Sequence, residues 1–282
     1  MREIKVAHSD HNTSRLRVFD AKGSRARLLW LAAMGTPARQ YDQLGEALRS
    51  QGISCALMDW RGIGSSSVRV QRGTNFGYDQ LMVDISESIA VLKEHASEDM
   101  LLLGGHSLGG QLALLASLRH PCNGLVLCGT GLPYWKTFGG LSGSALLTST
   151  LFINGLGKLL GRFPGRALRF AGNEAPAVMA DWTQTVRSGE YRLDGKRVDD
   201  RLAALRTPLL GIRLENDRLV PKASFDALLD KMPAARASRH RLDNTDFKRH
   251  KASHFGWMRE PAPVVRVIAN WWQEQLHLQN VA

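Results

Sequence analysis

The sequence predicts an α/β fold, with a mainly parallel sheet and helices on both of its faces. Between residues 28 and 128, strand-like apolar runs alternate with helix-like runs in the order strand, helix, strand, helix, strand, helix, strand. Parallel strands joined by crossover helices produce this alternation. The chain has 282 residues, of which 44% are hydrophobic and 22% charged. That length and composition suit one large core, or a core with an insertion.

Each element of this pattern has its own signal in the residues. Apolar and β-branched runs predict strands at Ile4–Ala7, Leu16–Phe19, Leu28–Ala32, Ser54–Met58, Met100–Leu103, Gly124–Cys128, Pro208–Arg213 and Ala237–Leu242. Helical patterns predict helices at Ala38–Ser50, Gln80–Glu94, Leu108–Arg119, Lys222–Lys231 and Pro261–Gln275. Short links join the segments before residue 28, with a turn at residues 20–24, so we expect an antiparallel start to the sheet.

The alternation stops after Thr130, and the next convincing strand begins at Pro208. The intervening stretch is too long and too apolar for a loop. We therefore divide the chain into a core, residues 1–131 and 207–282, and a helical insertion, residues 132–206. Over the carboxyl edge of the sheet, where ligands bind in open α/β folds, this insertion would form a lid.

Two amphipathic helices are expected within the insertion. Spaced leucines between Leu147 and Leu160 predict one, and residues 176–188 predict another, with Pro176 in its first turn. Leu151 and Trp182, one on each helix, are expected to line a substrate pocket. The alternative is a helical excursion that only packs against the core.

The most informative motif is Gly105-His106-Ser107-Leu108-Gly109, between an apolar run and a helix-like run. A turn this tight leaves little room for neighbouring side chains, which explains glycine at positions 105 and 109. It exposes the Ser107 hydroxyl and places the Leu108 amide at a helix N-terminus, which favours negative charge. The motif predicts a nucleophile, although a glycine-rich loop without chemistry remains the alternative.

A serine nucleophile needs a base, and the base needs an acid that orients it. Asp217 follows the strand that begins at Pro208, and His254 follows the last strand, so the chain order is Ser107, Asp217, His254. Asp217 could instead cap the helix near Lys222. The rival acids are Asp243 and Asp246, and the rival base is His250.

This order and spacing resemble the α/β-hydrolase superfamily over nearly the whole chain. Residues 59–65, Asp-Trp-Arg-Gly-Ile-Gly-Ser, look like its loop after the fourth strand, and His254-Phe255-Gly256 looks like its histidine loop. Residues 33–39, with His254 to Trp257, are similar to bacterial predicted hydrolases near the serine aminopeptidase and monoacylglycerol-lipase branch. The resemblance implies a catalytic triad but says little about the substrate.

The resemblance also implies an oxyanion hole of two backbone amides. Leu108 supplies one. The superfamily often has His-Gly after the third strand, and the residue after that glycine supplies the other. Here Met34-Gly35 stands at that place, so Thr36 is the candidate, and a shift of the alignment would make Met34 or Gly35 the donor.

Composition narrows the classes of function. The formal net charge of +11 is spread along the chain, and no block of basic residues occurs, so we expect a solvated basic surface and no nucleic-acid partner. The first residues lack the apolar core of a signal peptide, and no uninterrupted apolar run is long enough for a transmembrane helix, so no stable membrane insertion is expected. Cys55, Cys122 and Cys128 are unclustered and indicate buried thiols in the cytoplasm.

No cofactor or metal is expected. His250 and His254 have the spacing of metal ligands on a helix, but no glutamate follows His250 as in H-E-x-x-H, and the segment looks like a loop. The chain has no G-x-G-x-x-G motif, and Gly104 to Gly110 lacks the Lys-Ser/Thr of a P-loop.

The sequence thus predicts a serine hydrolase that cleaves a small-molecule acyl ester or thioester through an acyl-enzyme intermediate. A hydrolase fold kept as a binding protein is the alternative from another class. Acyl transfer, carbon–carbon bond hydrolysis and peptidase activity use the same triad. The oligomeric state stays open.

Overall fold

Eight strands form one sheet in this computed structural model, which describes residues 1–95 and 100–281. The order across the sheet is β1-β2-β4-β3-β5-β6-β11-β12. The strands are β1 (Arg2–Ala7), β2 (Thr13–Phe19), β3 (Ala26–Leu31), β4 (Ser54–Met58), β5 (Met100–His106), β6 (Gly124–Cys128), β11 (Leu209–Leu214) and β12 (Ala237–Leu242). β1 pairs with β2, and β2 with β4, in antiparallel register, whereas the other neighbours are parallel. The predicted fold class and all eight predicted strands are confirmed.

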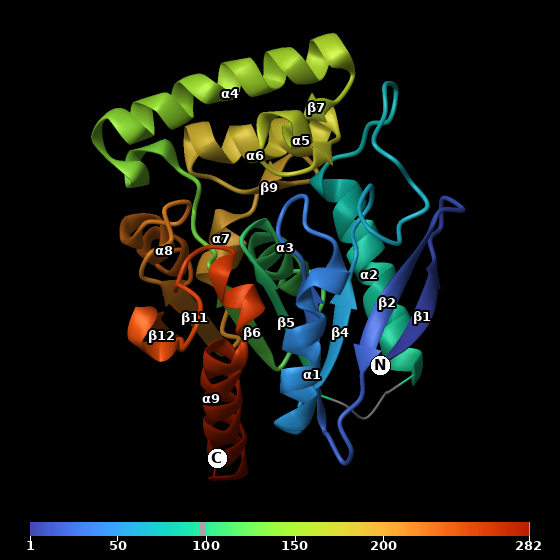
Figure 1. Cartoon of the computed structure of the whole chain (residues 1–282), viewed down its shortest axis with the longest axis vertical. Helices are drawn as coiled ribbons and strands as arrows, with labels where there is room; N and C mark the ends of the chain where they lie inside the picture. Colours follow the sequence, from blue (N-terminus) through green and yellow to red (C-terminus); the bar gives the residue numbers. More distant parts are fainter. Residues whose placement is uncertain (96–99, 282) are drawn as a thin grey trace.

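The sheet carries helices on both faces (Figure 1). α1 (Asp42–Ser50) packs with α9 (Ala262–Val281) on one face, and α2 (Tyr78–His95) packs with α3 (Leu108–Ser117) on the other. α8 (Lys222–Leu229) packs on β11, and four 3₁₀ turns are η1 (Ala38–Tyr41), η2 (Trp135–Phe138), η3 (Asn244–Asp246) and η4 (Gly256–Arg259). Every residue of β3, β4 and β6 is buried, as in parallel strands covered on both faces.

The 132–206 segment is mainly helical and lies above the carboxyl ends of the parallel strands (Figure 1). It contains α4 (Gly140–Leu160), α5 (Gly165–Leu168), α6 (Pro176–Ser188) and α7 (Asp199–Ala203). Two short hairpins join them, β7 (Phe163–Pro164) with β8 (Asn173–Glu174), and β9 (Arg192–Leu193) with β10 (Lys196–Arg197). The helix predicted at residues 176–188 is present with those bounds, and the one predicted from the leucines begins earlier, at Gly140.

α4 lies across α6 as the outermost layer of the molecule (Figure 1). The Asn154 side-chain amide donates to Thr183 Oγ1 at 2.9 Å, and Ile153 is buried. Gly143 admits no side chain, because a Cβ there would lie 2.4 Å from the Trp135 carbonyl oxygen. These contacts fix which face of α4 points inward. Among the described helices, none combines the length and apolarity that crossing a bilayer requires.

Candidate active site

Ser107 lies between β5 and α3 in a strained backbone conformation, with φ 56° and ψ −122°. A Cβ on Gly105 would lie 2.4 Å from the Gly109 carbonyl carbon, and a Cβ on Gly109 would lie 2.2 Å from the Leu31 carbonyl oxygen. Only glycine fits at either position. The close approach of α3 to β5 and β3 therefore sets where the serine stands.

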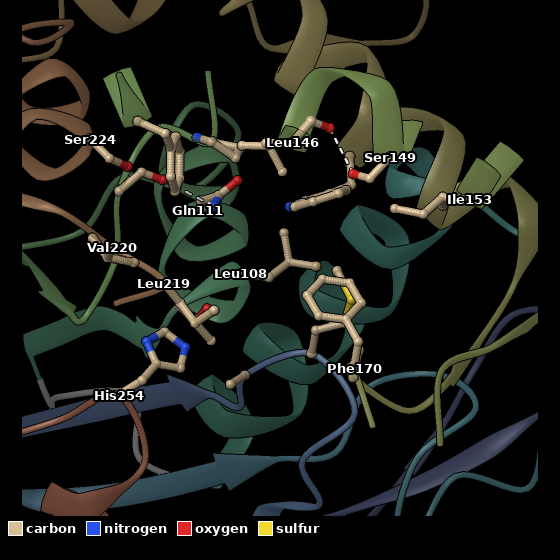
Figure 2. Close-up of a pocket in the computed structure, with 18 of the residues that line it drawn as sticks. Leu108, Gln111, Leu146, Ser149, Ile153, Phe170, Leu219, Val220, Ser224 and His254 are labelled. Atoms are coloured by element: carbon tan, nitrogen blue, oxygen red, sulfur yellow. Dashed lines mark hydrogen bonds between the residues drawn. The ribbon is translucent and has the colours of Figure 1, made fainter. Parts of the chain in front are cut away.

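Ser107 opens onto a cavity of about 490 Å³. Ala33, Met34, Leu108 and His254 border it from the core. Its other walls are mostly apolar side chains of the 132–206 segment, namely Pro133, Phe138, Leu146, Phe152, Ile153, Phe163, Leu168, Phe170, Ala171 and Trp182. In Figure 2, the α4 side chains Leu146, Ser149 and Ile153 lie across the cavity from His254. This size and apolar lining are typical of small-molecule sites.

Asp217 and His254 form a buried pair beside this cavity. His254 Nδ1 lies 2.7 Å from Asp217 Oδ2. The other carboxylate oxygen of Asp217 accepts the amides of Leu219, at 2.8 Å, and Val220, at 3.0 Å. Asp217 leaves β11 and His254 follows β12, so neighbouring parallel strands deliver the two side chains to one edge. The contact fixes the ring orientation and leaves Nε2 for another partner.

The ring of His254 packs between two other rings. Its centroid lies 4.6 Å from that of His106 and 4.7 Å from that of Phe255. His106 is completely buried, and this burial holds its pKa well below the usual value. Its Nδ1 lies 2.9 Å from the Tyr41 hydroxyl, which also accepts the Ala33 amide. Sequence reasoning missed this link between β5 and the loop after β3, because nothing near Tyr41 in the chain points to it.

In the structure, the Thr36 amide is not free to act as an oxyanion donor. Its amide donates to the Ala33 carbonyl oxygen at 3.0 Å and closes a tight turn. Thr36 also borders a different cavity, together with His250. Met34, one of the two alternatives left open, borders the cavity that contains Ser107. Within the described part of the chain, the amides of Met34 and Leu108 donate to no other group.

Leu151 was expected to line the pocket, and this expectation is wrong. Its side chain is 73% exposed and lies outside the cavity. The next two residues, Phe152 and Ile153, border the cavity instead, because α4 presents a different face than the leucine spacing indicated. Trp182 does border the cavity, from α6.

The rival residues have other roles. His250 borders the second cavity, and its amide donates to the Glu260 carboxylate. Asp243 and Asp246 form a capping box around η3, so both carboxylates hold backbone amides. Among these alternatives, only Asp217 contacts a histidine that borders the cavity of Ser107.

A second buried carboxyl lies near the loop after β3. Glu174 in β8 accepts the Gly172 amide at 3.0 Å, and burial raises its pKa to about 7. Gly172 in turn packs against Gly35, since a Cβ on Gly35 would lie 2.0 Å from the Gly172 nitrogen. The β7–β8 hairpin thus rests directly on the loop that carries Met34.

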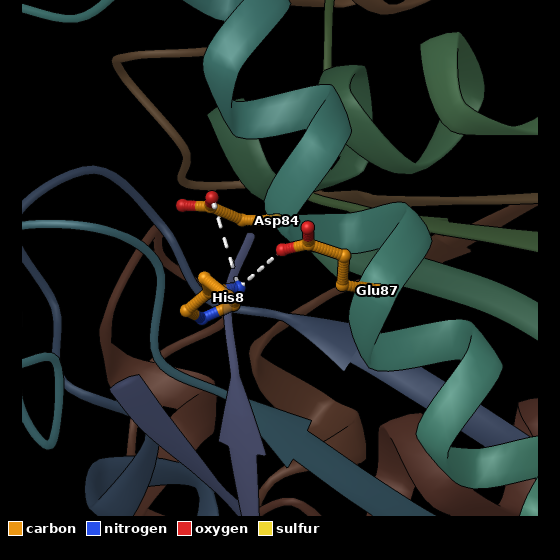
Figure 3. A group of neighbouring side chains, drawn as sticks. All are labelled: His8, Asp84 and Glu87. Atoms are coloured by element: carbon orange, nitrogen blue, oxygen red, sulfur yellow. Dashed lines mark hydrogen bonds and ion pairs between the residues drawn. The ribbon is translucent and has the colours of Figure 1, made fainter. Parts of the chain in front are cut away.

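One cluster has the residue types of a metal site. His8, Asp84 and Glu87 bring their ligand atoms within 4.8 Å of one another (Figure 3). The donor atoms are already engaged, however. His8 contacts Glu87 at 2.7 Å and Ser14 at 2.9 Å, and Asp84 pairs with both guanidinium nitrogens Nε and Nη2 of Arg61. We therefore interpret the cluster as a network of hydrogen bonds, with the Arg61–Asp84 ion pair, that holds the loop between β1 and β2 on α2.

Comparisons with known proteins bear on the family and the fold of this chain. Residues 23–250 match the family model described as serine aminopeptidase, S33. A hydrolase from Pseudomonas aeruginosa PA01 is similar over 96% of this chain and 98% of its own, with 19% identity and a TM-score of 0.61. A thermophilic esterase from Thermogutta terrifontis covers 98% of this chain and 99% of its own, at 17% identity and a TM-score of 0.63.

An enol-lactonase from Burkholderia xenovorans LB400 has 16% identity and a TM-score of 0.62 over 96% of this chain and 100% of its own. None of the curated proteins matches the chain. At these identities the solved structures show the fold alone, whereas the family model spans most of the chain. The chain belongs to the serine aminopeptidase S33 family of α/β hydrolases.

Proposed function

We propose that this protein is a serine hydrolase that cleaves an ester or thioester through an acyl-enzyme intermediate. One observation carries the proposal. His254, whose Nδ1 lies 2.7 Å from the buried Asp217 carboxylate, borders the same cavity as a serine held on a strained strand-to-helix turn. Nucleophile, base and orienting acid are the parts that acyl transfer by a serine needs.

In the proposed reaction, Ser107 Oγ attacks the substrate carbonyl carbon while His254 Nε2 takes the hydroxyl proton. The carbonyl oxygen becomes an oxyanion, which the amides of Leu108 and Met34 stabilise. The carbon–oxygen or carbon–sulfur bond then breaks, and His254 gives its proton to the leaving group. Water repeats the sequence on the acyl-enzyme, which releases the acid and restores Ser107. Asp217 keeps the imidazole in the correct tautomer throughout.

The cavity walls indicate the substrate class. Ten of the bordering residues are apolar side chains from the 132–206 segment, which supports the role of this segment as a lid over a medium acyl or aromatic group. Esterases and an enol-lactonase share the fold.

The three thiols, Cys55, Cys122 and Cys128, are free, which supports a cytoplasmic location.

The family description raises peptidase activity as a second candidate. A peptide amine would need a carboxylate in the site, and no aspartate or glutamate is among the described residues that border the cavity. Ester or thioester cleavage fits this lining better than recognition of a free amino terminus.

The test is a panel of p-nitrophenyl esters and acyl-CoA thioesters graded by acyl length, with an amino-acid p-nitroanilide as the peptidase arm. We expect turnover of medium acyl substrates, none of the anilide, and labelling of wild-type protein but not Ser107→Ala by a fluorophosphonate probe. Product analysis with and without an alcohol acceptor separates hydrolysis from acyl transfer. A native protein that neither turns over an ester nor reacts with the probe would support the binding-protein alternative.

A further inference from the structure

Large apolar side chains gather on the outside of one part of the molecule. Between residues 141 and 168, six leucine and phenylalanine side chains are more than 40% exposed, and Leu141, Leu151 and Leu159 exceed 70%. The others are Phe152, Leu160 and Leu168. We call these six residues the apolar face. Isolated exposed leucines are ordinary, but a group of them confined to one segment marks an interaction surface.

The apolar face cannot turn inward. The opposite side of α4 is already buried on α6, through Ile153 and the Asn154–Thr183 hydrogen bond. α4 is also the outermost layer of the described part of the fold (Figure 1). The exposure of Leu151 and Leu159 is therefore a property of how α4 is held.

The same face adjoins the cavity. Phe152 and Leu168 are exposed and also border the cavity that contains Ser107. Leu219 and Phe255, which are 48% and 49% exposed, border it from the core. The cavity thus opens among exposed apolar side chains, and an occupant of the apolar face would lie beside its mouth.

The charged side chains near the apolar face indicate what kind of partner would bind there. From Thr137 to Asn173 the sequence contains no aspartate or glutamate, but it contains Lys158, Arg162, Arg166 and Arg169. All four are exposed, and none forms a salt bridge within the described part of the chain. Arg72 joins them, because a Cβ on Gly161 would lie 3.0 Å from its Cγ. A second copy of this face would bring cations against cations, whereas an anionic surface would complement them.

We propose that the apolar face and its cations dock this protein on an anionic lipid surface. Exposed leucine and phenylalanine side chains would enter the boundary between headgroups and acyl chains, and the lysine and arginines would contact lipid phosphates. The cavity mouth would then face the lipid layer. This docking needs no catalysis, so it stands or falls separately from the proposed hydrolase activity.

The experiment is co-flotation of purified full-length protein with vesicles of phosphatidylglycerol mixed with phosphatidylcholine, against vesicles of phosphatidylcholine alone. Wild-type protein is expected to float with the anionic vesicles and to be released by salt. The double variant Leu151→Ser/Leu159→Ser and the double variant Lys158→Gln/Arg162→Gln should each bind at least about 10-fold more weakly. Neither pair borders the cavity, so hydrolysis of a water-soluble short ester should stay unchanged.

Matched controls lie on α9. Leu278→Ser removes an exposed leucine and Arg266→Gln removes an exposed arginine, both far along the chain from the apolar face. Both should float like wild type. Equal binding to both kinds of vesicle, no binding to either, or equal losses in the α9 controls would overturn the proposal. So would a concentration-dependent dimer in light scattering that Leu151→Ser/Leu159→Ser abolishes, since the face would then pair with a second copy.

Discussion

The turn around Ser107 and helix α4 lie on opposite sides of one cavity, and different physical demands shape them. Around Ser107 the backbone is fixed on every side, and two glycines are required because any Cβ would overlap a neighbour. α4 is held along one face only, and its outer face carries side chains in solvent. The proposed reaction would depend on atomic positions at the turn, whereas the proposed role of α4 would require only that its cavity-facing side chains be apolar. Changes at the turn should therefore alter rate, and changes on α4 should alter selectivity or location.

The largest effect should come from Ser107→Ala. Loss of the nucleophile in a triad costs on the order of 10⁶ in kcat. The melting temperature should stay close to that of wild type, because alanine occupies no more space than serine. Steady-state kinetics with a medium-chain p-nitrophenyl ester, together with circular dichroism, check both. More than about a tenth of wild-type activity would reject Ser107 as the nucleophile.

His254→Ala should be as damaging as Ser107→Ala, and the double variant should be no worse than either, because the two side chains act as one unit. His250→Ala is the matched control, since His250 borders a different cavity and should change kcat only mildly. The same kinetic assay measures all of these variants. If His250→Ala is the inactive one, the base has been assigned to the wrong histidine.

The next prediction concerns how the stability of the protein depends on pH, and it rests on the buried carboxyl of Glu174 in β8. Its pKa in the folded protein is about 7, above the ordinary value of 4.5. The folded state therefore binds this proton more tightly than the unfolded state. The stability that protonation contributes is present below about pH 4.5 and is lost as the pH rises through about 7.

Glu174→Gln keeps a neutral side chain at every pH. It should match wild type in acid and be more stable above neutral pH, by at most about 3 kcal/mol. Urea denaturation at a series of pH values measures the difference. A constant difference between the two proteins from pH 5 to pH 8 would show that Glu174 does not titrate in this range.

Trp182→Ala should give the smallest effect, a change of acyl preference by about 1–3 kcal/mol. Trp182 borders the cavity, so octanoyl esters should lose kcat/KM while acetyl esters, which do not reach the 132–206 segment, should keep it. Leu151→Ala is the control, because that side chain is in solvent and should leave both esters unaffected. Equal losses for both chain lengths would mean that the acyl pocket lies elsewhere.

The strands and helices of the core were predictable because each has a strong local signal. β4 and β6 have the predicted bounds, since a short apolar run between turns shows where a buried strand begins and ends. β12 also has the predicted bounds, although most of its residues are exposed. The strand-to-helix turn at Ser107 was equally clear, because glycine on both sides of the serine is a steric requirement. By contrast, β7 and β8 have only two residues each, too few to produce any periodic pattern.

The wrong predictions for the site arose where the local sequence does not determine which way a side chain or a backbone amide points. α4 is apolar on several sides, so the leucine spacing could not show whether Leu151 or Ile153 faces inward, and consecutive helical positions point about 100° apart. The prediction of Thr36 as an oxyanion donor was wrong for a related reason. The turn that begins at Ala33 closes on the Thr36 amide, and which amide a turn leaves free depends on backbone geometry that residue types do not encode.

The outermost strands of the sheet, β1 and β12, bear on aggregation. Among the described residues, each has one row of backbone groups without a neighbouring strand, and such a row can template the addition of a strand from another molecule. In β1 the exposed residues include Arg2, Glu3 and Lys5, and β12 exposes Arg239 and Arg241. Charges along both edges oppose strand addition between copies. A concentrated solution of this protein would therefore resist growth of intermolecular sheets, although it exposes apolar side chains on α4.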